Sequence, residues 1–424
     1  TAGDANRARQ EGTDPVLTDP GRTLVIMNLR LRSLLVALVG STLLFSACSP
    51  GNTTPSNTPE KTTPTASSTQ ETSPSPVAPA GALTITSSTD AALPSDPVTL
   101  SLENGTITNA TVTGPGGAVE GTFEKDAWTP SKALELNTEY KLAATASDGT
   151  TKEASFKTVS PGSAETTFSL PYMDDNLGVG MPAYVKFSRA IPQEYRASIE
   201  KHAKVTVTPT QEGSWGWISD TELAYRPKEY WKPGTKISLD LKWLGVQATD
   251  KTWLKKDSSG AFSIKNVSRV IKVDIANYTT TVVENGEVVK TLPSTTGKEG
   301  FVTRSGTKLI LEKYDSLKMN SDTIAIPSGS SEAYNLDAQY AMRVTWTGEF
   351  IHAAPWSVGS QGKANVSHGC VGLSTDNAGW LYKGTSIGDV VEFTGSDRKM
   401  KPSEGMGVWF YSWEEWKALS ASGS

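Results

Sequence analysis

Two successive stretches of the chain alternate apolar and polar residues in short segments, the pattern of antiparallel strands. In the first stretch the alternation is clear at residues 98–102 and 140–145, and the turn-forming pairs Asn104-Gly105 and Asp148-Gly149 follow these segments. Period-two patterning that is interrupted by turn dipeptides at close intervals predicts a small antiparallel β-sandwich. We assign this first module to residues 82–159.

A second sandwich of the same kind is predicted over residues 160–267, with strands at 183–187, 204–208 and 236–241. Its aromatic residues can either bind a carbohydrate or pack in the core: Trp215, Trp217, Tyr225, Tyr230 and Trp231. We favour packing, because aromatic side chains supply large apolar area to small cores. His202 has no cysteine or second histidine nearby in the sequence, so we expect a solvated surface residue.

The third module, residues 268–396, is predicted to be mostly β with one helix near 376–382. Strands at 270–276, 279–284 and 287–292 form a meander, because Asn285-Gly286 is a strong turn signal between the last two. Residues 397–424 form a short C-terminal subdomain. Its apolar content is concentrated in three tryptophans: Trp409, Trp413 and Trp416.

The N-terminal part of the chain is patterned for export. Met27, Arg30 and Arg32 precede an uncharged run at 33–47, which is typical of a signal peptide and short for a membrane span. The run ends at Cys48 in a sequence that resembles a bacterial lipobox. Residues 27–48 are therefore predicted to be a lipoprotein signal peptide with Cys48 as the lipidation site, and an ordinary signal peptide is the alternative. An acylated Cys48 would anchor the exported protein on the outer face of the cell membrane.

Two further segments are expected to lack a fold. Residues 1–26 are polar and unpatterned and precede the first plausible start at Met27. Residues 49–81 are almost entirely Ser, Thr, Pro, Asn, Glu and Ala, a composition that buries too little apolar surface to order a chain. We interpret this second segment as an extended linker between membrane and sandwiches.

Composition excludes some classes of function. A formal net charge of −5 offers no basic stripe for phosphates, so nucleic acid is not an expected partner. The chain has 12 Trp and only two cysteines, Cys48 and Cys370, so its cores do not depend on disulfides. We expect a monomer.

The second cysteine carries the candidate chemistry. Cys370 ends the polar, glycine-containing run Ser367-His368-Gly369-Cys370, a setting for a nucleophile rather than for inert packing. Acyl transfer needs the thiolate, so an imidazole or several backbone N–H groups must favour the anion. His352 is the candidate base, because its strand-like surroundings can hold the ring rigidly.

The remaining residues of this run have candidate supporting roles. The N–H groups of His368, Gly369 and Cys370 can form an oxyanion hole, and Gly369 permits the sharp turn that presents them. His368 can also support the loop. A zinc site made by His352, His368 and Cys370 is an alternative, but no Glu-x-x-His or Cys-x-x-Cys spacing supports it, so no metal is predicted.

Here the sequence resembles a known family. The stretch 350–357, which contains His352, and the run Ser367-His368-Gly369-Cys370 are similar to the signature of the L,D-transpeptidase catalytic domain. The segments 292–297 and 177–182 resemble the mycobacterial-type enzymes, as does the order of lipobox, linker, two immunoglobulin-like modules, catalytic domain and Trp-bearing C-terminal subdomain. The resemblance implies that a backbone carbonyl orients His352, which Ala353 can supply where relatives carry Ser.

The resemblance also implies a donor pocket beneath a flap that runs from about residue 308 to 336. Met319, Tyr334, Trp356 and Ser367 match its substrate-binding positions. Two residues depart from the family pattern: Ile324 stands where close relatives often carry Tyr, and Gly372 replaces the more usual Asn or Arg. Both changes remove polar contacts near the substrate. A further group can contribute polar contacts or lie on a surface loop: Thr303, Arg304 and Ser305.

By this resemblance the protein is a peptidoglycan L,D-transpeptidase that needs no cofactor. Cys370 would attack the third residue of a donor stem tetrapeptide and release D-Ala, and an acceptor stem would resolve the thioester into a 3→3 crosslink. Carbapenems are expected to acylate the same thiol. An L,D-carboxypeptidase that uses water as acceptor is one alternative, and a non-catalytic cell-wall-binding scaffold lipoprotein is another.

Overall fold

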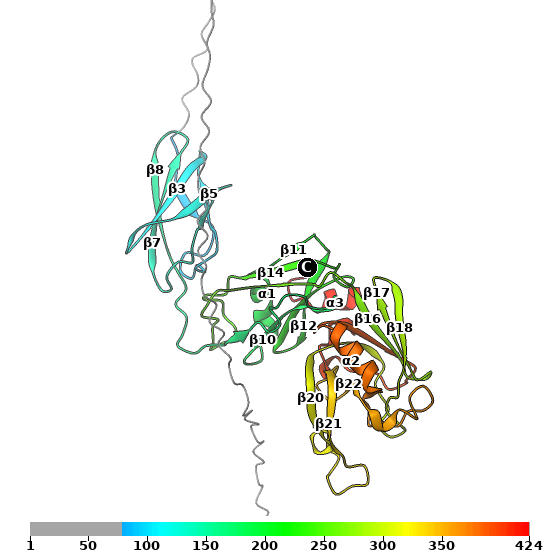
Figure 1. The fold of residues 1–424 in the computed structure, drawn as a ribbon. Helices are drawn as coiled ribbons and strands as arrows, with labels where there is room; N and C mark the ends of the chain where they lie inside the picture. The colour runs from blue at the N-terminus through cyan, green and yellow to red at the C-terminus, as the bar shows by residue number, and fades with distance from the viewer. Residues whose placement is uncertain (1–78, 424) are drawn as a thin grey trace, which may run out of the picture. The chain divides into compact units, whose positions relative to one another are not determined.

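A computed structural model describes residues 79–423 of the protein. Most of the regular secondary structure in this range is β-strand (Figure 1). The predicted upstream extension, the signal peptide with Cys48 and all but the last residues of the linker lie outside the described residues. In the part of the chain that is described, no helix has the length and apolar character needed to cross a membrane.

The first module is a sandwich of two four-stranded sheets, ordered β1-β2-β6-β5 and β4-β3-β7-β8. Its strands are β1 (Leu83–Ile85), β2 (Val98–Leu102), β3 (Ile107–Gly114), β4 (Gly117–Val119), β5 (Gly121–Glu124), β6 (Ala127–Pro130), β7 (Glu139–Ala146) and β8 (Thr151–Lys157). The strands expected at 98–102 and 140–145 are confirmed as β2 and β7. Trp128 and Leu142 are fully buried between the sheets, so this module has its own core.

The second module is also a sandwich, with sheets β12-β13-β10-β9 and β11-β14-β15. Its elements are β9 (Phe168–Ser169), β10 (Ala183–Phe187), α1 (Gln193–Lys201), β11 (Ala203–Thr208), β12 (Gly213–Ser219), β13 (Glu222–Pro227), β14 (Lys236–Leu241) and β15 (Ser258–Ser263). The three predicted strands are confirmed. Helix α1 was not predicted, because Ile199 is its only fully buried apolar side chain and no apolar stripe marks it.

Two expectations for this module have different outcomes. Trp215, Trp217 and Trp231 are buried, and Tyr225 and Tyr230 pack against the same core, so the packing interpretation of the aromatic set is confirmed. The expectation of a solvated His202 was wrong. Its side chain is only 8% exposed, and Nε2 lies 2.9 Å from Oδ1 of Asp96, a residue of the first sandwich that sequence distance hid.

The third module packs two sheets and a helix around one core. The sheets are ordered β18-β17-β16-β24-β19 and β20-β21-β22-β23. The elements are β16 (Arg269–Asp274), β17 (Thr279–Glu284), β18 (Glu287–Pro293), β19 (Gly306–Leu309), β20 (Glu312–Asn320), η1 (Ser321–Ile324), β21 (Asn335–Arg343), β22 (Phe350–Ala353), η2 (Pro355–Ser357), β23 (Val371–Leu373), α2 (Thr375–Gly384) and β24 (Val390–Thr394). Ile271, Ile351 and Leu381 bring both sheets and α2 into this core.

The predicted meander and helix of this module are both present. Strands β16, β17 and β18 pair in antiparallel succession, and the turn between the last two has positive φ at Asn285 (50°) and Gly286 (91°). That geometry explains the Asn-Gly pair, since both residue types tolerate the left-handed region. Helix α2 begins after Ser374, whose side chain caps the N–H of Asn377, and extends slightly beyond the predicted 376–382.

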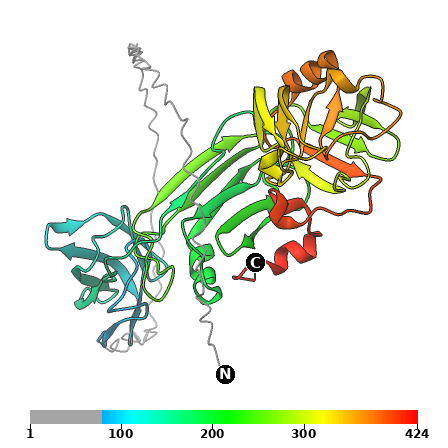
Figure 2. The ribbon, with the colours of Figure 1, turned by 90° about the horizontal axis from the view of Figure 1, so that it is seen from below.

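The C-terminal segment packs on the second sandwich rather than forming a core of its own (Figure 2). It contains η3 (Pro402–Glu404), η4 (Gly407–Trp409) and α3 (Trp413–Ala418). The indole of Trp416 is fully buried and donates to the carbonyl of Ser214 at 3.0 Å. The buried guanidinium of Arg226 lies over three indole rings, at 4.6, 5.4 and 5.0 Å from those of Trp409, Trp413 and Trp416.

Removal of this anchor should destabilise the protein. We expect Trp416→Ala to lower the free energy of unfolding by about 3–5 kcal/mol, because it empties a fully buried site and leaves the Ser214 carbonyl without its donor. Guanidinium denaturation followed by circular dichroism measures the change. Val288→Ala, at a side chain that is 63% exposed, is the control and should change stability by less than about 0.5 kcal/mol. Equal effects for both variants would contradict the packing described here.

Candidate active site

Two strands bring the candidate residues together. Strands β22 and β23 are parallel neighbours, with His352 opposite Gly372, and Cys370 immediately precedes β23. His352 and Cys370 therefore line one cleft of about 280 Å³. The other residues that line the cleft are Thr295, Met319, Tyr334, Leu336, Ala354, Trp356, Ser357, Val366, Ser367, His368 and Gly372.

His352 is buried and held in one orientation. Its Nδ1 lies 2.8 Å from the carbonyl oxygen of Ala353, so the geometry assigns the proton to Nδ1 and leaves the Nε2 lone pair free. Burial lowers the pKa of His352 below its ordinary value, since the cation would be desolvated. At neutral pH the ring is thus a neutral base, and the expected carbonyl is present.

The Cys370 thiol is protonated in the resting site. Its Sγ donates a weak hydrogen bond to the carbonyl oxygen of Gly348 at 3.7 Å. Burial raises the pKa of Cys370 to about 12; an N–H of Phe350 and the charge of Lys308 oppose this rise, and the charge of Glu349 adds to it. Desolvation thus outweighs the nearby positive charge in this state, and the thiolate that acyl transfer needs has to form with the help of a base.

His368 connects the nucleophile loop to the flap. Its Nε2 lies 2.7 Å from Oε2 of Glu332, which also accepts from Nζ of Lys298 at 2.6 Å. The ring packs against Phe301 and Tyr334, with centroids 4.6 and 5.1 Å away. This geometry agrees with a supporting role for His368, and Glu332 is a contributor that the sequence did not reveal.

The backbone of the nucleophile loop corrects one expectation. Gly369, at φ 124°, donates its N–H to Oγ of Ser367 at 3.0 Å, so this N–H is not free for an oxyanion. The Ser367 hydroxyl in turn donates to the carbonyl oxygen of Cys370 at 2.7 Å. Among the described residues, the N–H groups of His368 and Cys370 have no intramolecular acceptor. These two donors are the remaining oxyanion candidates.

The four residues expected to bind substrate all line the cleft. Met319 comes from β20 and Tyr334 from the turn before β21, whereas Trp356 lies on η2 and is 58% exposed. Ser367 belongs to the nucleophile loop. Burial raises the pKa of Tyr334 to about 12, so its hydroxyl is a neutral donor at the cleft.

The flap is the hairpin of β20 and β21 with the turn between them, so it begins and ends later in the chain than the expected 308–336. Lys308, which we had placed in the flap, lies on β19 in the other sheet and is fully buried. The contacts of the Ile324 side chain lie outside what the structure describes. Thr295 and Ser357, two further polar residues of the cleft, lie in the segments 292–297 and 350–357 that resemble the family, but neither was expected to line the cleft.

Gly372 has little room for a side chain. A Cβ at this position would lie 3.0 Å from both Cβ of Ala354 and Cγ2 of Thr295, and 3.4 Å from Oγ of Ser357. The side chains of Ala354, Thr295 and Ser357 thus pack close to the backbone of Gly372. The departure from the family pattern at Gly372 is accommodated by the residues around it.

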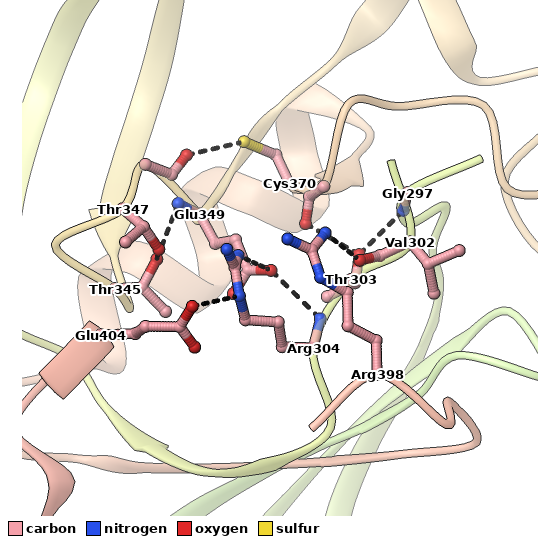
Figure 3. Close-up of polar contacts among 12 residues, drawn as sticks. Gly297, Val302, Thr303, Arg304, Thr345, Thr347, Glu349, Cys370, Arg398 and Glu404 are labelled. Carbon is pink, nitrogen blue, oxygen red and sulfur yellow. Dashed lines mark hydrogen bonds and ion pairs between the residues drawn. The ribbon is translucent and has the colours of Figure 1, made fainter. Parts of the chain in front are cut away.

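Beneath the cleft lies a buried polar network that the sequence did not predict (Figure 3). Thr303, Arg304 and Ser305 are buried or nearly so, which contradicts a surface loop. The Thr303 hydroxyl donates to the carbonyl of Gly369 at 2.8 Å, and Arg304 and Lys308 both pair with Glu349. No group of three or more His, Cys, Asp or Glu side chains in the described range is arranged to hold a metal ion.

Fold and site define a class: a β-domain whose cleft presents a thiol together with a neutral imidazole. A family model for a bacterial Ig domain matches residues 89–247, across both sandwiches, and one for the L,D-transpeptidase catalytic domain matches residues 268–393.

Individual relatives extend this match. L,D-transpeptidase 2 of Mycobacterium tuberculosis is 32% identical over 77% of this chain and 81% of its own length. L,D-transpeptidase 1 of the same species is 36% identical over 52% of this chain and 80% of its own. A solved L,D-transpeptidase from Mycobacterium smegmatis covers 55% of this chain and 99% of its own, with 34% identity and a TM-score of 0.44. The chain belongs to the L,D-transpeptidase family.

The protonation state of Cys370 is testable by alkylation. Because the pKa of the thiol is raised to about 12, we expect its reaction with iodoacetamide to be slow at neutral pH and to keep rising past pH 9, where an ordinary cysteine levels off near its pKa of about 8.5. Mass spectrometry of the Cys370 peptide follows the reaction. The same peptide in urea is the control, and a plateau below pH 8 in the folded protein would contradict the assignment.

The tight packing at Gly372 predicts a cost for any side chain. We expect Gly372→Asn to lower the free energy of unfolding by about 1–3 kcal/mol, because Thr295 and Ala354 must move apart. Thermal denaturation measures this effect. Gly359→Asn is the matched control, because Gly359 is exposed, has nothing within 4 Å of an added Cβ and does not lie at positive φ. Full stability of Gly372→Asn would show that the strand has room after all.

Proposed function

We propose that this protein forms 3→3 crosslinks between peptidoglycan stem peptides through a thioester on Cys370. The single observation that carries the proposal is the shared cleft, in which Cys370 and a neutral His352 with a free Nε2 lie in a domain of this family. The donor is a stem tetrapeptide, and the acceptor is an amine of a neighbouring stem.

The protonation states suggest the order of events. With a protonated thiol and a neutral imidazole at rest, the Sγ proton passes to Nε2 of His352 as sulfur attacks the carbonyl of the third, diaminopimelate-type residue. The imidazolium then returns that proton to the amine of the departing D-Ala. An acceptor amine attacks the thioester and gives a proton to Nε2 of His352, which passes it to the departing sulfur and so restores the free thiol and the neutral imidazole.

The neighbouring groups support these steps. The carbonyl oxygen becomes an oxyanion during attack, and the N–H groups of His368 and Cys370 are the donors available to it. The carbonyl of Ala353 stabilises the imidazolium through Nδ1. The cleft is lined mainly by apolar side chains such as Met319, Leu336 and Val366, which limits competing water.

The cellular setting is part of the proposal and rests on the sequence. The signal peptide at 27–48 and the lipobox place an acylated Cys48 in the outer leaflet, and the linker gives the catalytic domain reach into the wall. Radiolabelled palmitate that enters the wild-type protein but not Cys48→Ala would support the anchor, and equal labelling would refute it.

The reaction is tested on purified protein with a stem tetrapeptide. We expect a covalent adduct on Cys370 and a crosslinked dimer in the wild type, and neither in Cys370→Ala. His352→Ala should acylate about 100- to 10,000-fold more slowly, because it loses the general base. Mass spectrometry measures both products, and a carbapenem labels the same thiol independently of the acceptor.

The outcomes separate the alternatives. A tripeptide without a dimer would indicate a carboxypeptidase, and an intact wild type that no donor or carbapenem labels would indicate a scaffold. Val288→Ala, at an exposed residue that does not line the cleft, is the control and should react as the wild type does.

A further inference from the structure

Glu349 is a buried carboxylate directly below the nucleophile. It precedes β22, three residues before His352, and is only 4% exposed. Burial of a charged side chain costs several kcal/mol unless partners compensate for the lost hydration, so such a residue calls for a physical explanation.

Its partners account for both carboxylate oxygens. Oε1 accepts from the backbone N–H of Arg304 at 3.1 Å and from Nη1 of the same residue at 3.0 Å, while Oε2 accepts from Nζ of Lys308 at 2.7 Å. Lys308 is fully buried and lies 3.7 Å from the ring centroid of Phe393. Arg304 also bonds Glu404, so two cations face two anions. We call Arg304, Lys308 and Glu349 the ion cluster.

The ion cluster is joined to the nucleophile by two routes (Figure 3). The first is the turn before β22: the Glu349 N–H bonds the Thr345 hydroxyl at 2.9 Å, and Gly348 between them offers its carbonyl to Sγ of Cys370. The second route runs through Thr303, which precedes Arg304 in the chain. Its hydroxyl donates a hydrogen bond to the carbonyl oxygen of Gly369.

Gly369 also lies near the Glu349 side chain. A Cβ at Gly369 would come within 3.7 Å of Cγ of Glu349, so the nucleophile loop passes close beside this side chain. Displacement of Glu349 would therefore change the position of the loop that carries Cys370 as well as that of the carbonyl facing the thiol.

We propose that Glu349 is a positioning residue, whose ion pairs with Arg304 and Lys308 hold the Gly348 carbonyl and the Thr303 hydroxyl, and through them Cys370, in place for attack. This inference rests on the proposed acyl transfer at Cys370. A buried ion pair gives little net stability over an apolar replacement of equal size, which makes position a better explanation of the cluster than stability.

The charges also act on the thiol itself. The negative charge of Glu349 raises the pKa of Cys370, whereas Lys308 on β19 and Arg343 on β21 lower it. Removal of the Glu349 charge leaves Lys308 without its carboxylate partner, whereas Arg304 keeps its pair with Glu404. The thiol should then ionise more easily, which speeds alkylation. It should also be displaced from the position for attack, which slows acylation.

The test compares Glu349→Gln with the wild type in the full chain. Alkylation of Cys370 by iodoacetamide should shift to lower pH, because the thiolate is favoured. Acylation by a stem tetrapeptide should slow by about 100-fold, because a displacement of the reacting sulfur by about 1 Å lowers the rate of attack by about that factor. Glu349→Asp keeps the charge and should restore the pH profile of alkylation while recovering acylation only in part.

A matched control separates position from stability. Asp389→Asn breaks another buried lysine–carboxylate pair, in which Asp389 of the catalytic domain meets Lys265 of the second sandwich and which, within the described residues, makes no hydrogen bond or ion pair with the nucleophile loop. It should lower the melting temperature without a shift in alkylation pH and without a selective loss of acylation.

Each outcome has one meaning. A folded Glu349→Gln that acylates at the wild-type rate would overturn the inference, as would parallel loss of alkylation and acylation that follows the melting temperature. If the wild type itself forms no adduct while its alkylation is normal, the proposed function fails instead. If Glu349→Gln does not fold, the double variant Lys308→Met with Glu349→Gln removes both charges of the pair. Its alkylation and acylation are then measured in the same way.

Discussion

The whole site depends on one pairing, the parallel contact between β22 and β23. Parallel neighbours cannot be joined by a tight hairpin, so a long connection must leave the end of β22 and return to the start of β23. That connection contains Trp356 and Ser367, and both line the cleft. The same pairing places His352 on one strand beside Cys370, which precedes the other.

Glycine makes this pairing compatible with an open cleft. Gly372 pairs with His352 on one side and with Thr295 on the other, and its missing side chain lets Ala354 and Ser357 approach. Gly369 turns the chain at positive φ just before the nucleophile. The missing side chains of Gly372 and Gly369 thus help to shape the cleft, while its polar groups come from neighbouring residues.

Electrostatics at the cleft are dominated by burial. His352 and Cys370 are both shifted toward their neutral forms, and the cations of the ion cluster do not overcome the desolvation of the thiol. A thiol that is held in its neutral form reacts slowly, because the thiolate is the nucleophile. The tie from His368 through Glu332 to Lys298 further links the nucleophile loop to the flap that covers the cleft.

Local signals in the sequence determined most strands, the Asn285-Gly286 turn, helix α2 and the pair of Cys370 and His352, because period-two patterning, turn dipeptides and a short chemical motif are written within a few consecutive residues. Only the tertiary structure decided the contacts of His202 with Asp96, of Glu349 with Lys308 and of Arg226 with the C-terminal indoles. Each of these contacts joins residues that are far apart in the chain. The identity of a charged residue does not reveal whether folding will bury its side chain. Long-range packing and desolvation, which no short window of sequence contains, set those positions and the protonation state of the thiol.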